Sequence, residues 1–403
     1  MLRNVVIVGA SLAGLRAAET LRNEGFDGTV TLINGEMHLP YDRPPLSKRV
    51  LAGELQHDDI HLRKEADYEP LDLDIRFGRL ATALDTTAQT ITLDDGETLP
   101  YDGLIIATGA TPRQIPGTPD LEGIYVLRTL EDSLSVRAEL DKVPSRVVVV
   151  GAGFIGAEVA ATARKRGLEV TILEALPVPL VRALGNHMGA ACAAVHADHG
   201  VEVRTSTGVE AIEGTSRVER VRLSDGSTLD ADIVVVGIGV VPNTSWLEGS
   251  GLEIRDGVVC DATLAAGPPG VYCAGDITRW PNQLFDEEMR VEHWTNAAEQ
   301  GAAAASNLLL GPGNGVPYAP VPFFWSDQYD SRIQFVGRAH GEDEVKVVHG
   351  SVDERKFVAL YGREGRLVGA LGMSMPKLLM PYRKPLAARM SWDDALAEAA
   401  SRS

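Results

Sequence analysis

The chain has 403 residues, of which 44% are hydrophobic and 23% are charged, and its formal net charge is −18. This length favours two or three domains with sizeable cores. The negative charge argues against nucleic acid and anionic membranes as binding partners, and no apolar run approaches the length of a membrane span. The three cysteines, Cys192, Cys260 and Cys273, form no C-x-x-C pair. They indicate neither a redox dithiol nor a disulfide framework, so we expect a cytoplasmic protein.

The first predicted elements form a nucleotide-binding pattern. A strand, Val5–Val8, is followed by Gly9-Ala10-Ser11-Leu12-Ala13-Gly14, a helical pattern and a second strand, Thr29–Ile33, which leads to Glu36. In such a unit the glycines let the backbone approach a pyrophosphate at the helix N-terminus, and the acid accepts hydrogen bonds from a ribose. Ser11 stands where a second glycine is typical. It weakens the literal motif, although its small side chain still allows a close approach.

A proline-rich loop comes next, with the sequence Pro40-Tyr41-Asp42-Arg43-Pro44-Pro45-Leu46-Ser47-Lys48. Its three prolines fix φ and stiffen the segment. We expect this loop to hold Arg43 and Lys48 rigidly beside an anion or a ring. The alternative is a structural turn with solvated basic side chains.

The nucleotide-binding pattern returns in the middle of the chain with full G-x-G-x-x-G spacing. Its parts are, in order, a strand, the glycines, a helix, a second strand and an acid: Val147–Val150, Gly151, Gly153 and Gly156, Phe154–Arg166, Glu169–Leu173 and Glu174. This order predicts a bound dinucleotide, and the alternative is a tight turn without a ligand. A carboxylate at Glu174 pairs with a free ribose 2′-OH and repels a 2′-phosphate. We therefore expect NADH to be preferred over NADPH by at least about tenfold, or about 1.4 kcal/mol.

Both copies continue in the same way, which indicates an internal duplication. Leu93–Leu99 resembles Leu223–Leu229, because each places a D-G turn between apolar segments as in a hairpin. Each is followed by an apolar strand that ends in glycine, at Thr108-Gly109 in the first copy and at Gly237-Ile238-Gly239 in the second. Two such copies predict a flavin dinucleotide that exchanges electrons with a nicotinamide dinucleotide. The alternative is a degenerate second copy that binds nothing.

Other segments frame these copies. Ala110–Thr129 is rich in Pro and Gly and is typical of a crossover between domains. Gly270–Asp276 is a short strand that ends in an acid, which can bind sugar or ribityl hydroxyls or, alternatively, cap the next segment. Glu292–Leu310 predicts a packed helix. His196 and His199 have no further ligand nearby in the sequence, so we expect them at the surface rather than at a metal.

The last part of the chain follows a Gly- and Pro-rich boundary at Gly311–Pro322. Four alternating segments predict an antiparallel sheet: Ile333–Val336, Val345–Val348, Phe357–Tyr361 and Leu367–Leu371. Ser391 is expected to cap a final helix with Asp394 as its partner. Because this module has no phosphate-binding signature, its expected roles are dimerisation, covering the flavin or docking a partner.

With these motifs, the chain resembles the NADH-dependent ferredoxin reductases that serve cytochrome P450 and Rieske-type oxygenases, nearly from end to end. The most specific stretches are Arg43-Pro44-Pro45-Leu46-Ser47-Lys48, Phe154-Ile155-Gly156-Ala157-Glu158, Gly237-Ile238-Gly239, Ala274-Gly275-Asp276 and Phe324-Trp325-Ser326-Asp327-Gln328-Tyr329. The resemblance implies an α/β protein with two Rossmann-like dinucleotide-binding domains of glutathione-reductase-like architecture and a C-terminal α+β domain with an antiparallel sheet. It implies an FAD domain at 1–112 and 238–315, an NADH domain at 113–237 and the C-terminal domain at 316–403.

The same resemblance assigns residues to the FAD and NADH cofactors. Asp276 matches the acid that binds the flavin ribityl chain, Trp294 matches a residue whose backbone reaches the flavin pyrimidine edge, and Arg182 matches a cation near the NADH adenosine. The full set of implied cofactor-binding residues is Gly9, Ser11, Leu12, Ala13, Gly14, Glu36, Arg43, Lys48, Ala81, Thr108, Gly109, Arg128, Gly151, Gly153, Phe154, Ile155, Gly156, Glu158, Glu174, Arg182, Gly237, Gly239, Gly275, Asp276, Trp294 and Trp325.

The implied activity is that of an NADH:ferredoxin oxidoreductase. Hydride passes from NADH to N5 of non-covalently bound FAD, and single electrons then pass to a [2Fe–2S] ferredoxin. Lys48 and Glu158 match a pair beside N5 and are the expected catalytic residues, and Trp325 matches an aromatic on the partner-facing side. The ferredoxin is expected near Trp325 and a local basic patch, for which the candidates are Lys377, Arg383, Lys384, Arg279 and Arg290.

Two other functions compete with this interpretation. An NADH oxidase or peroxidase usually needs a thiolate beside the flavin, but the proline-rich loop contains Ser47 and no cysteine. A flavoprotein similar to the apoptosis-inducing factors would need a basic surface, which the net charge of −18 disfavours.

Overall fold

The computed structural model describes residues 2–402, which form two compact units. The first unit consists of the chain up to Asp42, Ile60–Thr111 and Val241–Pro322. The second consists of Arg43–Asp59, Pro112–Val240 and the chain from Phe323 onward. The proline-rich segment after Asp42 therefore belongs to the unit that also carries the second glycine motif.

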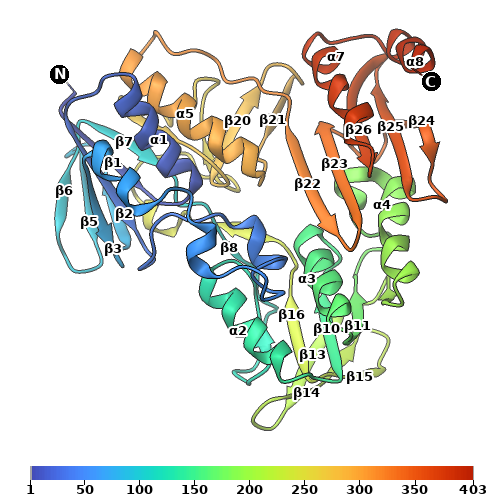
Figure 1. Cartoon of the computed structure of the whole chain (residues 1–403). Coiled ribbons are helices and arrows are strands. Elements are labelled where there is room, and N and C mark those ends of the chain that lie inside the picture. The colour runs from blue at the N-terminus through green and yellow to red at the C-terminus, as the bar shows by residue number, and fades with distance from the viewer. Residues whose placement is uncertain (1, 403) are drawn as a thin grey trace. The chain divides into compact units, whose positions relative to one another are not determined.

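The first unit is built on a five-stranded parallel sheet. The strand order is β19 (Val271–Cys273), β7 (Gly103–Ile106), β1 (Asn4–Val8), β2 (Thr29–Asn34) and β3 (Leu73–Phe77). Val5–Val8 are all buried, as expected for a parallel strand covered on both faces. Helices α1 (Leu12–Asn23) and α5 (Trp294–Leu310) lie side by side (Figure 1). They pack so closely that a Cβ on Gly301 would lie 2.2 Å from the carbonyl oxygen of Ala13.

Two small sheets complete this unit. The antiparallel sheet that contains the first D-G hairpin consists of β4 (Ala81–Asp85), β5 (Thr90–Leu93) and β6 (Thr98–Pro100). The other consists of β18 (Val258–Val259), β20 (Thr278–Asn282) and β21 (Glu287–Met289). Strands β8 (Ala110–Pro112) and β17 (Val240–Pro242) lie where the chain passes from one unit to the other.

The second unit repeats this design. Its parallel sheet has the order β12 (Glu202–Arg204), β11 (Glu169–Leu173), β10 (Arg146–Val150), β16 (Ile233–Val236) and β9 (Ile124–Tyr125). Val147 and Val149 of β10 share a core with α2 (Leu130–Asp141), α3 (Phe154–Lys165) and α4 (Val181–Asp198). The alternate residues Val148 and Val150 pack against the antiparallel strands β13 (Val209–Gly214), β14 (Val218–Leu223) and β15 (Thr228–Asp230).

The C-terminal module of the second unit is an antiparallel sheet with three helices. The strand order is β22 (Phe323–Gln328), β23 (Ser331–Gly337), β26 (Arg366–Met373), β25 (Lys356–Arg363) and β24 (Glu344–Ser351). The helices are α6 (Pro376–Leu379), α7 (Arg383–Ala387) and α8 (Trp392–Ser401). Its core is continuous with that of α3 and α4, so this module is packed onto the nucleotide-binding helices (Figure 1).

The predicted duplication and the predicted C-terminal sheet are both confirmed. β1 pairs with β2 and β7 as β10 pairs with β11 and β16, and both D-G segments form hairpins. Ser391 caps α8, accepting a hydrogen bond from the backbone of Asp394 at 3.1 Å. The sequence pattern missed strand β22, whose residues do not alternate simply between apolar and polar. None of the helices within residues 2–402 combines the length and the hydropathy that a transmembrane segment requires.

Candidate active site

The first glycine loop joins the carboxyl end of β1 to the N-terminus of α1. Gly9 has a φ of +110°, and a Cβ there would lie 2.2 Å from the Ala107 carbonyl oxygen. A Cβ on Gly14 would lie 1.9 Å from the carbonyl oxygen of Gly9. Both positions therefore require glycine for the turn and the packing. Ser11 stands between them as the N-cap residue of α1, and the free N–H groups of a helix N-terminus suit a pyrophosphate.

The second glycine loop has the same two steric requirements and one additional opening. Gly151 has a φ of +99° and its Cβ would lie 2.4 Å from the Gly237 carbonyl oxygen, while that of Gly156 would lie 2.1 Å from the oxygen of Gly151. A Cβ on Gly153 would meet only that Gly237 oxygen, at 3.9 Å. The neighbouring atoms among residues 2–402 thus give no steric reason for glycine at position 153. The space that Gly153 leaves fits the approach of a dinucleotide pyrophosphate.

Each loop has its acid at the end of the second strand. Glu36 accepts a 2.5 Å hydrogen bond from the hydroxyl of Tyr41. The carboxylate of Glu174 accepts hydrogen bonds from the backbone N–H groups of Ala152, at 3.0 Å, and Leu176, at 2.9 Å. Glu174 is therefore fixed directly on the second glycine loop, which its place in the sequence could not show.

Exposed apolar side chains flank the second loop. Ile155 is 49% exposed at the start of α3, and Ile238 is 38% exposed between Gly237 and Gly239. Such surfaces suit the planar rings of a nucleotide. Phe154 is turned toward the C-terminal module, where its ring centroid lies 4.7 Å from that of Phe324.

The Lys48–Glu158 pair is present in the second unit and is the most buried ion pair at the predicted site. Lys48 Nζ lies 2.7 Å from Glu158 Oε2, and their side chains are 17% and 4% exposed. Ser47 donates to the same oxygen at 2.5 Å, and Ser326 of β22 donates to Oε1 at 2.8 Å. One carboxylate thus accepts from three donors. The proposed turn with a solvated Lys48 is wrong, because the loop delivers this cation to a buried acid.

Ser47 and Ser326 are functional candidates that sequence reasoning did not select. In the sequence, Ser47 stands out only because it is not a cysteine, and Ser326 only as part of a stretch typical of the family. The η1 turn (Pro44–Ser47) places Ser47, while Thr162 of α3 donates to the Ser47 carbonyl oxygen at 2.9 Å. Since these residues are far apart in the sequence, only the fold reveals the cluster.

The other predicted residues are distributed over the two units. In the second, Arg43 donates to the carbonyl oxygen of Arg128 at 2.6 Å, Arg182 is exposed at the start of α4, and the ring of Trp325 stacks on that of Phe323 at 6.0 Å. The first unit carries the remaining FAD candidates: Gly9, Ser11, Leu12, Ala13, Gly14, Glu36, Ala81, Thr108, Gly109, Gly275, Asp276 and Trp294.

Within the first unit, two hydrogen bonds bear on these candidates. The indole N–H of Trp294 donates to Asp42 at 2.6 Å, which ties the start of α5 to the end of the first segment. Thr108 donates to the carbonyl oxygen of Asn243 at 3.1 Å. Asp276 does not cap a helix, because the element that follows it is strand β20. The role of Asp276 as a ribityl-binding acid therefore stays a prediction.

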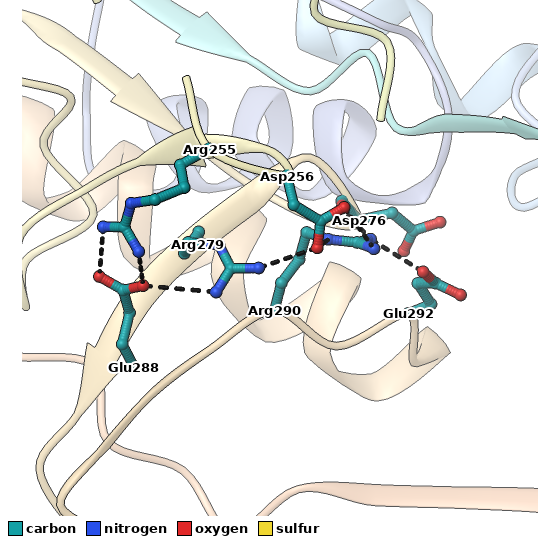
Figure 2. A network of polar contacts seen from close by, with 7 residues as sticks. All are labelled: Arg255, Asp256, Asp276, Arg279, Glu288, Arg290 and Glu292. Carbon is teal, nitrogen blue, oxygen red and sulfur yellow. Dashed lines mark hydrogen bonds and ion pairs between the residues drawn. The ribbon is translucent and has the colours of Figure 1, made fainter. Parts of the chain in front are cut away.

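Two arginines of the expected basic patch are neutralised by acids. Arg279 pairs with Asp256 at 2.8 Å and with Glu288 at 3.3 Å (Figure 2). Arg290 pairs with Glu292 at 2.8 Å and with Asp256 at 3.3 Å (Figure 2). Their side chains are only 19% and 10% exposed, so they offer little positive charge to a partner. Lys377, Arg383 and Lys384 remain as patch candidates.

One of the two histidines, His196, differs from the surface position expected for both. His196 is buried, and its Nδ1 lies 3.0 Å from the hydroxyl of Tyr329, while the ring of His199 stacks on the same tyrosine at 3.8 Å. Burial lowers the pKa of His196 to about 4. This pair therefore joins α4 to the C-terminal module.

The cysteines do not supply a thiolate. All three are buried and free, and burial raises the pKa of Cys192 to about 12 and that of Cys273 well above its usual range. A thiol-dependent oxidase or peroxidase needs an accessible thiolate. The cysteines therefore give no support to that alternative.

Comparison with known proteins decides the family. Residues 3–301 match the model of the pyridine nucleotide-disulphide oxidoreductases, and residues 323–402 match that of the reductase C-terminal domain. The chain belongs to the pyridine nucleotide-disulphide oxidoreductase family. It is therefore an oxidoreductase, and its cofactors are FAD and NAD(H). The three cysteines of this chain are free thiols and form no disulfide with one another.

Its relatives in the family match it along almost the whole chain. It is 38% identical to rhodocoxin reductase from Rhodococcus erythropolis, over 96% of this chain and 90% of that protein. It is 36% identical to the ferredoxin–NAD(+) reductase component of the anthranilate 1,2-dioxygenase system from Burkholderia cepacia, over 95% of this chain and 94% of that protein. The crystal structure of a covalent putidaredoxin reductase–putidaredoxin complex matches with a TM-score of 0.92 and 32% identity, covering 99% of this chain and 98% of that one.

Proposed function

We propose that this oxidoreductase transfers electrons from NADH through FAD to a [2Fe–2S] ferredoxin that supplies a cytochrome P450 or a Rieske-type oxygenase. In balance, NADH and two oxidised ferredoxins give NAD⁺, one proton and two reduced ferredoxins. FAD, when bound, accepts the electron pair of a hydride and releases electrons one at a time. The relatives named above, which are reductases of dioxygenase and ferredoxin systems, support this choice of partner.

The observation that carries the proposal is the buried Lys48–Glu158 pair on the helix that begins at the second glycine loop. Glu158 lies in the second turn of α3, whose first residue, Phe154, follows Gly153. Residues of this helix would therefore be placed to hold the nicotinamide end of a dinucleotide bound at the loop. Lys48 then supplies positive charge where negative charge develops during hydride transfer, and Glu158 holds Lys48 in place.

The remaining roles follow from the loops. We assign the first glycine loop and Glu36 to FAD, and the second loop, Glu174 and Arg182 to NADH. In this assignment the FAD domain comprises residues 1–112 and 238–315, the NADH domain residues 113–237, and the C-terminal domain begins at residue 316. A cytoplasmic location is supported by the three free thiols.

The activity is tested by NADH-driven reduction of cytochrome c by the purified protein, with and without a [2Fe–2S] ferredoxin. We expect fast reduction only when the ferredoxin is present. Equal rates without it, or rapid turnover of peroxide, would favour an oxidase or peroxidase on the same fold.

The role of Lys48 is tested by stopped-flow reduction of the protein-bound flavin by NADH. Lys48→Met should slow this step by about tenfold or more, since about 1.4 kcal/mol of stabilisation corresponds to that factor. Arg49→Met is the matched control, because Arg49 is the neighbouring cation but forms only an exposed pair with Glu54 at 3.5 Å. An unchanged rate in Lys48→Met would remove Lys48 from the mechanism.

A further inference from the structure

The turn that carries Asp276 is held by side chains from two other segments. Gly275 and Asp276 follow the end of β19, so their peptide groups need partners outside that strand. The N–H of Gly275 donates to Oε1 of Gln300 at 2.9 Å, and the carbonyl oxygen of Asp276 accepts from Nη1 of Arg290 at 3.0 Å. The turn is therefore fixed on both sides of the Asp276 side chain.

Arg290 itself lies among acidic side chains that contact it, as Figure 2 shows. Its guanidinium donates to Glu292 at 2.8 Å and to Asp256 at 3.3 Å in addition to the Asp276 carbonyl oxygen. The loop just before β18 packs closely against the Arg290 side chain, because a Cβ on Gly257 would lie 3.0 Å from Cδ of Arg290. A guanidinium that is braced by two carboxylates and only 10% exposed can fix a backbone carbonyl with little loss of freedom.

Gln300 also has a buried hydrogen-bond donor without a partner among the described residues. Its side chain is fully buried in α5, and its amide nitrogen has no hydrogen-bond partner among residues 2–402. Leaving such a donor unpaired costs about 1–3 kcal/mol, so stability alone does not account for glutamine at this position. The amide nitrogen of Gln300 is therefore available to donate a hydrogen bond to a group from outside the protein.

The held turn lies against the first glycine loop. Gly275 has a φ of +82°, and a Cβ there would lie 3.2 Å from Cβ of Ala13, at the start of α1. The helix that carries Gln300 crosses the same point, because Gly301 packs on the Ala13 backbone. Asp276, Gln300 and the N-terminus of α1 thus meet at the end of the loop assigned to the flavin dinucleotide.

We propose that Arg290 and Gln300 are positioning residues for FAD, which hold the Gly275–Asp276 turn so that the Asp276 carboxylate meets the ribityl hydroxyls. The inference rests on the proposed role of Asp276 in FAD binding. Arg290 acts through the Asp276 carbonyl group, and Gln300 acts through the Gly275 N–H. Neither residue takes part in electron transfer itself. Arg290 thus serves the cofactor site rather than the surface patch for which it was first considered.

The test is titration of FAD into the apoprotein, followed by flavin fluorescence, with the melting temperature of each apoprotein measured separately. Arg290→Met should raise the Kd of FAD by about tenfold or more, and Arg290→Lys should recover part of the affinity. Arg255→Met is the matched control: Arg255 belongs to the same network through Glu288, at 2.5 Å, but does not touch the turn. Its Kd should equal that of the wild type.

A double-mutant cycle shows whether Arg290 acts through Asp276. Asp276→Asn combined with Arg290→Met should bind FAD about as weakly as Asp276→Asn alone. Full additivity, or wild-type affinity in Arg290→Met, would overturn the inference. If Arg290→Met does not fold, Gln300→Leu carries the same test, with an unchanged Kd as the contrary result. A wild-type apoprotein that takes up no FAD at all would instead refute the proposed function.

Discussion

The two dinucleotide loops of this protein share their first and third glycines but differ at the middle position of the motif. In each, the first and third glycines are required by neighbouring carbonyl oxygens at 1.9–2.4 Å from the would-be Cβ. The middle position is serine in the first loop and glycine in the second, where the protein leaves open space. The comparison separates glycines that the fold requires from a glycine for which the surrounding residues give no steric reason.

The acids of the two loops also differ, in the kind of group that holds each carboxylate. Glu36 is held by the side chain of Tyr41, at the start of the proline-rich stretch that the second copy lacks. Glu174 is held by two backbone N–H groups, one from Ala152 in its glycine loop and one from Leu176 just after it in the chain. The acid of the first loop thus depends on a side chain from an additional segment, which suits a cofactor that stays bound. The acid of the second loop needs only backbone partners, which suits a dinucleotide that leaves after each turnover.

The largest expected effect comes from the third glycine of each loop. Gly14→Ala should give protein without FAD, and Gly156→Ala should keep FAD but lose reduction by NADH, because each Cβ overlaps a carbonyl oxygen. Overpacking of this kind costs about 1–3 kcal/mol or more, so both melting temperatures should fall. Flavin content and NADH reduction measure the two outcomes. A Gly156→Ala protein with wild-type kinetics would mean that the loops are not equivalent.

The acid of the second loop should control the choice of nicotinamide cofactor. The wild type should prefer NADH over NADPH by about tenfold or more in kcat/KM, and Glu174→Ala should reduce that ratio to near one by removing the repulsion of a 2′-phosphate. Glu202→Ala on the adjacent strand is the control, since Glu202 is an exposed acid paired with Arg204. Comparable use of both cofactors by the wild type would contradict the assignment.

Exchanging the middle residues sharpens the comparison further. Gly153→Ser should raise the KM for NADH several-fold without lowering the melting temperature, because its Cβ meets only one protein atom, at 3.9 Å. Ser11→Gly should leave FAD retention close to that of the wild type. If Gly153→Ser instead lowered the melting temperature as much as Gly156→Ala, the middle glycine would have a structural role.

The smallest effect concerns His196, which has no counterpart in the first copy. Burial lowers its pKa from 6.5 to about 4, so the unfolded chain binds a proton more readily than the folded one. Stability is therefore complete above pH 6.5 and declines as the pH falls toward 4, by at most about 1.4 kcal/mol per pH unit. Thermal melts between pH 7.5 and 5 should show a weaker decline in His196→Gln. The exposed His187→Gln, on the same helix, should behave as the wild type does.

The sequence was sufficient for the duplicated nucleotide-binding units because their signals are local. Glycine spacing, buried β-branched strands and D-G turns each depend on a few neighbouring residues. Strand β22 was missed because Phe323–Trp325 are all aromatic and Ser326 and Gln328 are polar but buried. Its inward polar groups make sense only beside Glu158, which lies on a different element.

The site shows the same division between local and distant signals. Lys48 and Glu158 were selected through a family resemblance, but Ser47 and Ser326 required the fold, since the Ser326–Glu158 hydrogen bond spans 168 residues. Arg279 and Arg290 were misjudged because sequence alone does not reveal that Asp256, Glu288 and Glu292 surround them. Burial of His196 likewise depends on Tyr329, from the distant C-terminal module.

Strand β22 limits where insertions and deletions can be tolerated in this protein during evolution. Its even-numbered residues, Phe324 and Ser326, contact α3, while Phe323 and Trp325 stack together on the other face. Inserting or deleting one residue within the strand would exchange the two faces, sending the indole inward and the serine hydroxyl to solvent. Variation in length is therefore confined to the segment before Phe323, while β22 can accept substitutions only at constant length.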